Sequence, residues 1–338
     1  MRPAEPPPLR YLAAADVTRA MPELDERLAL AEQTMTALAT GAELPAKIGI
    51  HPRPEGSFVH AMPAHLRGSH ANGRDDLVGM KWVAGFGTNN ALGLPAINAL
   101  VVLNDETTGF PTAILDGGPI TAQRTAAVSG VAIRRFAPVR GRDGLNAALI
   151  GAGVQGRSHL PVLGRVLPGV RLSVFDRHPE RAEALANDAR RTEGIGAVTV
   201  TTDARSATEG ADVVVTVASF SPVRQVMTGE WLQPGALVVP VDYATYCAAD
   251  VARDAALFLV DHREQFLANR AAGLFEDYPE PSATIGEALL AGTPRPPAGR
   301  VVVTHLGVGL ADVIFGAAIL ARARELGLGI ELPRGSSS

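Results

Sequence analysis

The sequence predicts an α/β fold, in which a doubly wound parallel sheet is joined to a discontinuous α+β domain. From residue 145 onward, apolar runs of strand length alternate with helical segments, and this rhythm is typical of a parallel sheet covered by helices. The first of these runs, at 145–150, enters a glycine-rich turn, GAGVQG. The first 120 residues show mostly short strands and one amphipathic helix, without such a turn. The two parts of the chain therefore predict two different domains.

The length and composition are those of a globular protein with two domains. The 338 residues are 46% apolar and 20% charged, which is enough for a substantial core. The net charge of −4 gives no reason to expect a nucleic acid or a membrane surface as a partner. Cys247 is the only cysteine, which excludes an intrachain disulfide and fits a reducing compartment. We find no signal peptide and no apolar run long enough to span a bilayer, so we expect a cytoplasmic protein.

Periodicity places the elements of the first domain. Apolar residues at spacings of three and four predict a helix over 22–40. Alternating patterns predict strands within 46–66, 76–84 and 95–103. The polar stretch NDETTG at 104–109 predicts a hairpin-like turn into a further strand, FPTAILD.

A helix links the two predicted domains. The segment 121–136 has small and apolar residues at helical spacing, with Thr121 as its predicted N-cap. Strand runs alternate with helices after it; they are ALI, RLSVFD, VTVTT, ADVVVTVA, ALVVPVD, ALFLVD and VVVTHL. The helix after His305 lies beyond these strands and is predicted to return to the first domain. We therefore expect one domain over 1–125 with 307–338 and a second over 126–306.

The glycine-rich turn predicts a dinucleotide site of the Rossmann type, because strand, turn, helix and acid follow one another at the required spacing. Gly151 allows the tight turn, Gly153 lets a pyrophosphate approach the backbone, and Gly156 lets the helix pack against the strand. Val154 and Gln155 complete the turn at the helix N-terminus, whose N–H groups suit phosphates. The alternative is an ordinary βαβ turn without a ligand.

The acid after the second strand bears on the choice of cofactor. Asp176 follows the turn at the distance where a carboxylate can accept hydrogen bonds from the ribose hydroxyls. It repels a 2′-phosphate, which favours NAD. Arg177 and Arg181 follow closely and could accept that phosphate, so NADP stays open, although Arg181 also fits a solvated helix face.

Lysine is rare in this chain. Lys47 and Lys81 are the only lysines among 31 basic residues. Surface lysine usually interchanges with arginine, so the two that remain are candidates for positions that need a compact ammonium group. A group of histidines in the first domain could suggest a metal, but it lacks ligand spacing, and we expect no metal. These histidines are His51, His60, His65 and His70.

Several stretches together resemble the ornithine cyclodeaminase/mu-crystallin family. They are GMKWVAGF, TAQRTAAVSG, GAGVQG, VVPVD and LGVGLAD. The resemblance implies a discontinuous substrate-binding and dimerisation domain, a Rossmann domain and a homodimer. Members of the family include ornithine cyclodeaminase, an archaeal-type alanine dehydrogenase, ketimine reductases and opine-like synthases. The stretch KIGIHPRPEGSFVHAMPAHL also resembles an actinobacterial subgroup whose members are called the second subunit of a tyramine oxidase.

The resemblance implies a role for four charged residues. Arg124 matches an arginine that contacts the substrate carboxylate, and Lys81 matches the lysine of the same site. Lys47 falls where most members place another arginine on that carboxylate. Asp242 matches the acid that handles the substrate nitrogen and its protons. The plainer alternatives are a surface ion pair for Arg124, solvated lysines, and a helix cap for Asp242.

Further candidates surround these residues. His305 lies where the family often has a serine near the nicotinamide amide, and a buried hydrogen-bonded histidine is the alternative. Thr121 and Ala218 are candidate cofactor contacts. Asn89 could hold polar groups of the substrate, and Tyr243 could line its pocket. The stretch YATYCAAD after VVPVD departs from ornithine cyclodeaminases, which argues against ornithine as the substrate.

The expected function is NAD(P)-dependent chemistry on an amino acid or an imine. A hydride leaves Cα for the nicotinamide, an imine forms, and cyclodeamination then releases ammonia. One alternative is a net ketimine reductase or an alanine-type dehydrogenase. Another is a non-catalytic, NADP-dependent binding protein like mu-crystallin. The presence of Lys81, Arg124 and Asp242 together argues for an enzyme, because binding alone needs no proton-handling acid.

Overall fold

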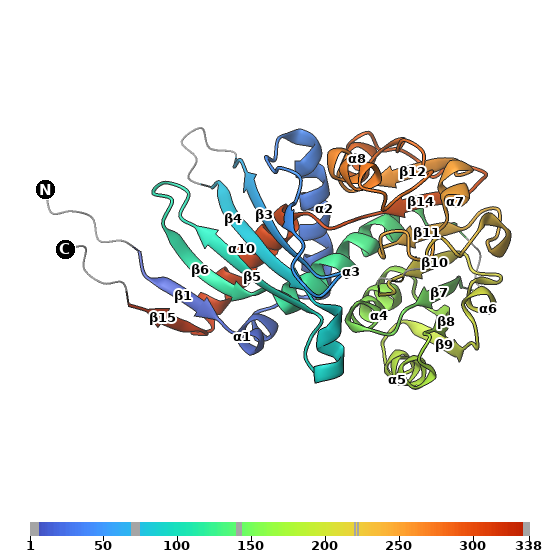
Figure 1. The fold of residues 1–338 in the computed structure, drawn as a ribbon, viewed down its shortest axis with the longest axis horizontal. Helices are drawn as coiled ribbons and strands as arrows, with labels where there is room; N and C mark the ends of the chain where they lie inside the picture. The colour runs from blue at the N-terminus through green and yellow to red at the C-terminus, as the bar shows by residue number, and fades with distance from the viewer. Residues whose placement is uncertain (1–6, 69–74, 140–143, 220, 222, 334–338) are drawn as a thin grey trace, which may run out of the picture. The chain divides into compact units, whose positions relative to one another are not determined.

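The chain forms two compact units in a computed structural model (Figure 1). Unit 1 consists of residues 1–124 and 308–338, and unit 2 of residues 125–307. The structure describes residues 7–68, 75–139, 144–219, 221 and 223–333. The expected α/β class is confirmed, because unit 2 contains a parallel sheet with helices and unit 1 a separate mixed sheet.

Unit 1 is built on a seven-stranded sheet in the order β15-β1-β6-β5-β4-β3-β2. The strands from β2 to β6 form an antiparallel meander, and β1 joins β6 in parallel. The strands are β1 (Leu9–Leu12), β2 (Ile48–Ile50), β3 (Phe58–Leu66), β4 (Leu77–Gly85), β5 (Ile97–Asn104), β6 (Pro111–Asp116) and β15 (Ile330–Leu332). The strands and the turn expected from alternation are thereby confirmed.

The helices of unit 1 cover one face of this sheet. Helix α10 (Gly309–Glu325), from the C-terminal part of the chain, packs against β3, β4 and β5 and against α2 (Leu24–Thr40). Along β4, Lys81 is buried whereas its neighbour Trp82 is 45% exposed. Successive side chains of a strand point to opposite faces, so β4 places Lys81 on the covered face and Trp82 on the open one.

Unit 2 contains the doubly wound parallel sheet, in the order β13-β12-β14-β11-β10-β7-β8-β9. Its strands are β7 (Asn146–Ile150), β8 (Val170–Phe175), β9 (Ile195–Val200), β10 (Val213–Thr216), β11 (Leu237–Pro240), β12 (Leu257–Val260), β13 (Ala283–Thr284) and β14 (Val301–Thr304). Its helices are α4 (Val154–Val166), α5 (Pro179–Ala189), α6 (Ala204–Thr208), α7 (Ala249–Arg253), α8 (Arg263–Ala271) and α9 (Ile285–Leu290). The strand order reverses between β7 and β10, which is where such folds bind ligands.

Two details differ from the sequence-based expectations. Thr121 is not an N-cap, because α3 begins four residues earlier and spans Gly117–Phe136. Its start contains Pro119, which is tolerated in a first helical turn, where the backbone N–H would lack a helical partner. Unit 1 also contains a helix, α1 (Ala14–Arg19), and a 3₁₀ helix, η1 (Gly87–Leu92), that periodicity does not predict. No helix in the described part of the chain is both long enough and apolar enough to cross a membrane.

Candidate functional site

The glycine-rich turn of unit 2 has the geometry that its sequence predicts. Gly151 has a φ of +112°, and a Cβ there would lie 2.7 Å from the carbonyl oxygen of Val217. A Cβ on Gly156 would lie 2.2 Å from the carbonyl oxygen of Gly151. At Gly153, the N-cap of α4, an added Cβ would meet no atom within 4 Å. The first two glycines are therefore required by packing, whereas Gly153 keeps an open approach to the helix N-terminus.

Asp176 is fixed by backbone donors at the end of β8. Its Oδ2 accepts a hydrogen bond from the N–H of Ala152 at 2.7 Å, and its Oδ1 accepts one from the N–H of His178 at 2.9 Å. The first of these bonds ties the carboxylate to the glycine turn. Arg177, the next residue, is exposed. The open glycine, the helix N-terminus and this carboxylate fit the pyrophosphate and ribose of a dinucleotide.

Asp242, which follows β11, is a buried carboxyl group whose oxygens make no hydrogen bond of good geometry to the described residues. Its side chain is 4% exposed, and neither carboxylate oxygen has a hydrogen-bond partner among the described residues. Burial raises the pKa of Asp242 to about 6, although the nearby Thr216 hydroxyl and backbone N–H groups oppose part of this rise. Helix α7 begins only at Ala249, so Asp242 does not cap it. Such a carboxyl group can gain and lose a proton near neutral pH.

The turn after Asp242 is strained and held from several sides. Tyr243 and Ala244 have φ values of +53° and +60°, a region that non-glycine residues rarely adopt. The Tyr243 hydroxyl donates to the carbonyl of Leu306 at 2.9 Å, and the guanidinium of Arg224 donates to the carbonyl of Tyr243. The N–H of Gln225 donates to the carbonyl of Ala244 at 3.2 Å. Strain of this kind persists where surrounding contacts enforce it, often at functional sites.

Ala218 and His305 lie at the same edge of the unit 2 sheet as Asp242. They follow β10 and β14, and β11 lies between these two strands. The backbone N–H of Ala218 is close enough to Asp242 to lower its pKa slightly. His305 is 1% exposed, and its Nε2 lies 2.9 Å from the hydroxyl of Ser129. The carboxyl ends of three adjacent strands thus bring the three predicted residues to one edge.

Unit 1 contains a buried cluster of charges around Lys81. Its Nζ donates to Oδ1 of Asp312 at 2.9 Å and to the hydroxyl of Thr121 at 2.6 Å. Nε of Arg124 donates to the same Oδ1 at 3.3 Å. Lys81, Arg124 and Asp312 are 1%, 6% and 0% exposed, respectively. Burial lowers the pKa of Lys81 to about 8; the Asp312 carboxylate opposes this shift and the Arg124 guanidinium adds to it.

The charges of this cluster do not balance. With Lys81 protonated, it contains two cations and one carboxylate, and Oδ2 of Asp312 has no hydrogen-bond partner among the described residues. Buried charges normally find partners, but the cluster carries one positive charge in excess. Asp312 is absent from our sequence-based candidates. Its only signal is its place in LGVGLAD, one of the stretches that carry the family resemblance.

The other predicted residues of unit 1 differ in their relation to this cluster. Thr121 donates its hydroxyl hydrogen to the carbonyl of Gly117 while it accepts from Lys81, which makes it part of the charge cluster. Lys47 is partly buried just before β2, and its charge lowers the pKa of Lys81. Asn89, in η1, donates its side-chain amide to the carbonyl of Pro95 at 2.9 Å.

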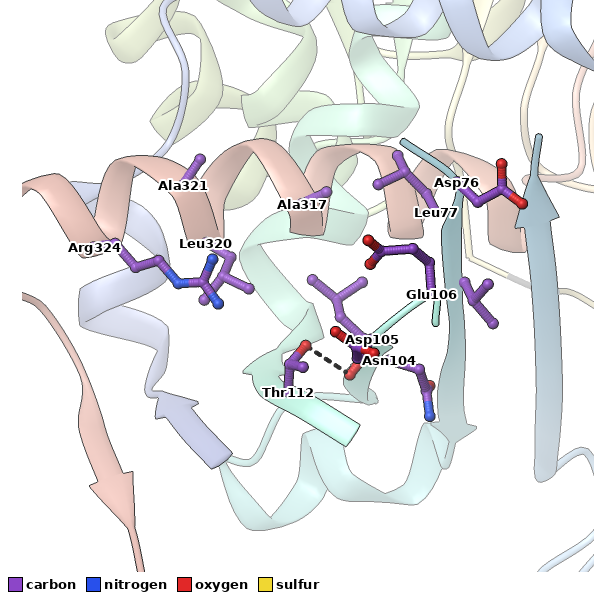
Figure 2. Close-up of a pocket in the computed structure, with 12 residues that line it drawn as sticks. Asp76, Leu77, Asn104, Asp105, Glu106, Thr112, Ala317, Leu320, Ala321 and Arg324 are labelled. Atoms are coloured by element: carbon purple, nitrogen blue, oxygen red, sulfur yellow. Dashed lines mark hydrogen bonds between the residues drawn. The ribbon is translucent and has the colours of Figure 1, made fainter. Parts of the chain in front are cut away.

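A pocket of about 240 Å³ in unit 1 contains none of the predicted residues (Figure 2). Two of its three acidic residues already have local roles. Asp76 accepts hydrogen bonds from His65 and from the N–H of Gly68, and Asp105 accepts from the backbone and hydroxyl of Thr108. No group of described residues has the composition and spacing of a metal site.

Comparison with known proteins identifies close relatives. The sequence model of the ornithine cyclodeaminase/mu-crystallin family matches residues 12–288. Nodulation efficiency protein NfeD of Rhizobium meliloti is 34% identical, over 95% of this chain and 98% of its own length. Ketimine reductase mu-crystallin of Mus musculus is 29% identical, over 76% of this chain and 78% of its own. The structure of Thermococcus litoralis Δ1-pyrroline-2-carboxylate reductase in complex with NADH and L-proline superposes with a TM-score of 0.82, at 25% identity, covering 96% of this chain and all of that one.

Proposed function

Because the chain belongs to the ornithine cyclodeaminase/mu-crystallin family, we propose that it is an NAD(P)-dependent enzyme acting on an amino acid or an imino acid. The reaction would transfer a hydride between the substrate Cα and the nicotinamide, with an imine as substrate, product or intermediate. Asp242 carries this proposal, because a buried carboxyl group with a raised pKa, whose oxygens make no hydrogen bond of good geometry to the described residues, is suited to proton transfer.

We propose NAD as the cofactor and the glycine turn as its binding site. The N-terminus of α4 and the open face of Gly153 would hold the pyrophosphate, and Asp176 would accept from the ribose hydroxyls. When bound, the nicotinamide supplies the acceptor or donor of the hydride. The Thermococcus reductase was solved with NADH, which supports the same class of cofactor here. The exposed Arg177 keeps NADP as the alternative.

The charge cluster of unit 1 is proposed to bind the substrate carboxylate. Lys81 and Arg124 would neutralise and orient it, with Lys47 adding positive charge, and Asp312 would hold the two buried cations in place. The single net positive charge of the Lys81–Arg124–Asp312 set matches one carboxylate, which is what an α-amino or α-imino acid presents. The L-proline bound to the Thermococcus reductase belongs to this class.

Asp242 is proposed to move the proton at the substrate nitrogen. With a pKa of about 6, it is mostly ionised at neutral pH, and its protonation costs little free energy. In the oxidative direction it would accept a proton from the substrate ammonium, which leaves a neutral amine whose lone pair assists the loss of hydride from Cα. In the reductive direction it would return that proton.

Two reactions share this hydride-transfer step. In cyclodeamination, a side-chain amine attacks the imine carbon and ammonia leaves. The reduced nicotinamide then returns the hydride to the same carbon of the cyclic imine. In the second candidate, a net imine reduction or an amino-acid oxidation, the cofactor leaves in its changed redox state. The Thermococcus protein is a reductase of a cyclic imino acid, which favours the second candidate.

Asp242→Asn tests the role of the carboxyl group directly. The amide cannot accept a proton, so we expect turnover to fall by about 10²–10⁴-fold, while the affinity for NADH changes little. Asp212→Asn is the matched control, since Asp212 is also buried in unit 2 but accepts a backbone hydrogen bond from Asn146 at 2.9 Å. Full turnover in Asp242→Asn would contradict the mechanism.

We propose that the open face of the unit 1 sheet binds a second copy of the chain. Ile48, Trp82 and Leu100 lie opposite one another across β2, β3, β4 and β5, through Ala61 of β3. The three are 62%, 45% and 40% exposed. Apolar rows of this kind usually mark an interface. A second copy would present the same apolar row, as a two-fold symmetric dimer requires.

A further inference from the structure

Three buried polar side chains form a continuous hydrogen-bonded relay through unit 2. His159 of α4 places Nδ1 2.7 Å from the backbone carbonyl oxygen of Gln155 and Nε2 2.8 Å from the hydroxyl of Ser129 in α3. The same hydroxyl lies 2.9 Å from Nε2 of His305, after β14. Ser129 and His159 are fully buried. The relay therefore connects the glycine-rich turn, which contains Gln155, with the carboxyl edge of the sheet.

The carbonyl oxygen of Gln155, at one end of the relay, determines which group donates in each of its hydrogen bonds. A backbone carbonyl only accepts, so Nδ1 of His159 must carry a proton. Burial lowers the pKa of His159 to about 4, so the ring is neutral at pH 7 and its Nε2 carries only a lone pair. The Ser129 hydroxyl then donates its single hydrogen to His159, and its oxygen can only accept from Nε2 of His305.

For a neutral His305 ring, the last step places the proton on Nε2. A neutral imidazole that carries its proton on Nε2 has a lone pair on Nδ1. This ring lies at the same edge of the sheet as Asp242 and Ala218, which follow β11 and β10, and a doubly wound sheet receives its ligand at the carboxyl ends of its strands. A lone pair at this edge is complementary to an N–H donor, such as the primary amide of a nicotinamide.

We propose that Ser129 and His159 are positioning residues that hold His305 in its Nε2-protonated tautomer, so that Nδ1 selects the carboxamide NH₂ of the nicotinamide. The carboxamide contact rests on the cofactor site proposed above; the relay itself does not. Apolar side chains could fill the same space without the free-energy cost of burying three polar groups. Packing alone therefore does not explain why these three residues are polar.

The tautomers can be measured in the free protein by NMR with ¹⁵N-labelled histidine. Long-range proton–nitrogen correlations distinguish a proton on Nδ1 from one on Nε2, and His159→Gln and His305→Gln assign the two rings by loss of their signals. We expect His159 to carry its proton on Nδ1 and His305 on Nε2. In Ser129→Ala, His305 should become a mixture of tautomers, whereas Thr208→Val, which removes another buried hydroxyl of unit 2, should leave both rings unchanged. A proton on Nδ1 of His305 in the unaltered protein overturns the relay.

The selection of the carboxamide is measured by binding. NADH is compared with reduced acetylpyridine adenine dinucleotide, whose acetyl group has no N–H. Loss of one hydrogen bond predicts about tenfold weaker binding of the analogue to the unaltered protein. In Ser129→Ala this ratio should fall to about threefold or less, and in Thr208→Val it should stay unchanged.

Equal ratios in the unaltered protein and in Ser129→Ala overturn the positioning role. If neither nucleotide binds, the proposed cofactor and the carboxamide contact both fail, and the tautomer spectra decide the relay by themselves.

Discussion

Asp242→Asn should make the protein more stable at neutral pH while it lowers turnover by about 10²–10⁴-fold. The carboxyl group is buried, and neither of its oxygens has a hydrogen-bond partner among the described residues. Its ionised form is therefore penalised in the folded protein and not in the unfolded chain. Asparagine has nearly the same shape and no charge, so it removes this penalty.

The size and pH range of the effect follow from the pKa. Burial raises the pKa of Asp242 from 3.8 to about 6, and each unit corresponds to about 1.4 kcal/mol, giving about 3 kcal/mol. Between these two pKa values the folded state holds the proton more tightly than the unfolded chain, so the stability of the unaltered protein falls as the pH rises from about 4 to about 6. Above pH 6 the penalty is fully present, and below about pH 4 it is absent.

Thermal unfolding of the two proteins across this pH range is the assay. For a chain of this length, 3 kcal/mol corresponds to a rise in Tm of roughly 4 °C, which should appear at pH 7 and disappear near pH 4. Asp212→Asn is the control, and it should lower the Tm at pH 7 because it weakens a satisfied hydrogen bond to the backbone. A lower Tm for Asp242→Asn at pH 7, or a difference that does not depend on pH, would refute the reasoning.

Three further predictions concern the other parts of the structure. Asp312→Asn leaves Lys81 and Arg124 buried together and should reduce the unfolding free energy, measured in urea, by about 3–5 kcal/mol. The control Asp188→Asn, which alters the exposed pair with Arg191, should reduce it by less than about 1 kcal/mol. Equal losses in the two variants would contradict a buried ionic cluster around Asp312. Gly153→Ala should keep the native circular dichroism spectrum and bind NADH about tenfold more weakly. Gly151→Ala should instead unfold unit 2 at a lower temperature, because the φ of Gly151 and its contact with Val217 exclude a Cβ. Unchanged NADH affinity in Gly153→Ala would count against the glycine turn as the cofactor site. Trp82→Asp should shift the mass measured by light scattering from dimer to monomer, whereas Val139→Asp, at a 98% exposed position, should not; a monomeric unaltered protein would exclude the dimer.

The sequence predicted those parts of the fold that depend on neighbouring residues. The glycine turn and its helix are a local pattern, in which each glycine meets an adjacent strand or loop. The strand alternation in β3, β4 and β5 is equally local, and it also assigned Lys81 and Trp82 to opposite faces once one face was known to be buried. The predicted start of α3 at Thr121 was wrong because the helix already begins at Gly117, and Pro119 is well tolerated in its first turn.

Contacts between distant residues could not be predicted in this way. Lys81 and Asp312 are separated by 231 positions, and Ser129 and His305 by 176. Periodicity assigns each of these residues to a helix or strand, but the partner depends on how those elements pack. Asp312 lies in a largely apolar helix, where a single acid gives no signal until its two cations are seen beside it. The roles of the site residues and the subgroup resemblance remain predictions.

The most direct test of the proposed function is a paired assay of redox change and ammonia. The protein is incubated with NAD⁺ and a panel of amino acids that includes L-proline and L-ornithine, and with NADH and cyclic imino acids, while the NADH absorbance band and free ammonia are followed together. We expect a change at the NADH band with at least one α-amino or α-imino acid, or ammonia release that requires NAD⁺ without net NADH. The first result indicates net hydride transfer, and the second indicates cyclodeamination. Bound NADH with neither signal for any member of the panel would contradict an enzyme of this class and favour a binding protein.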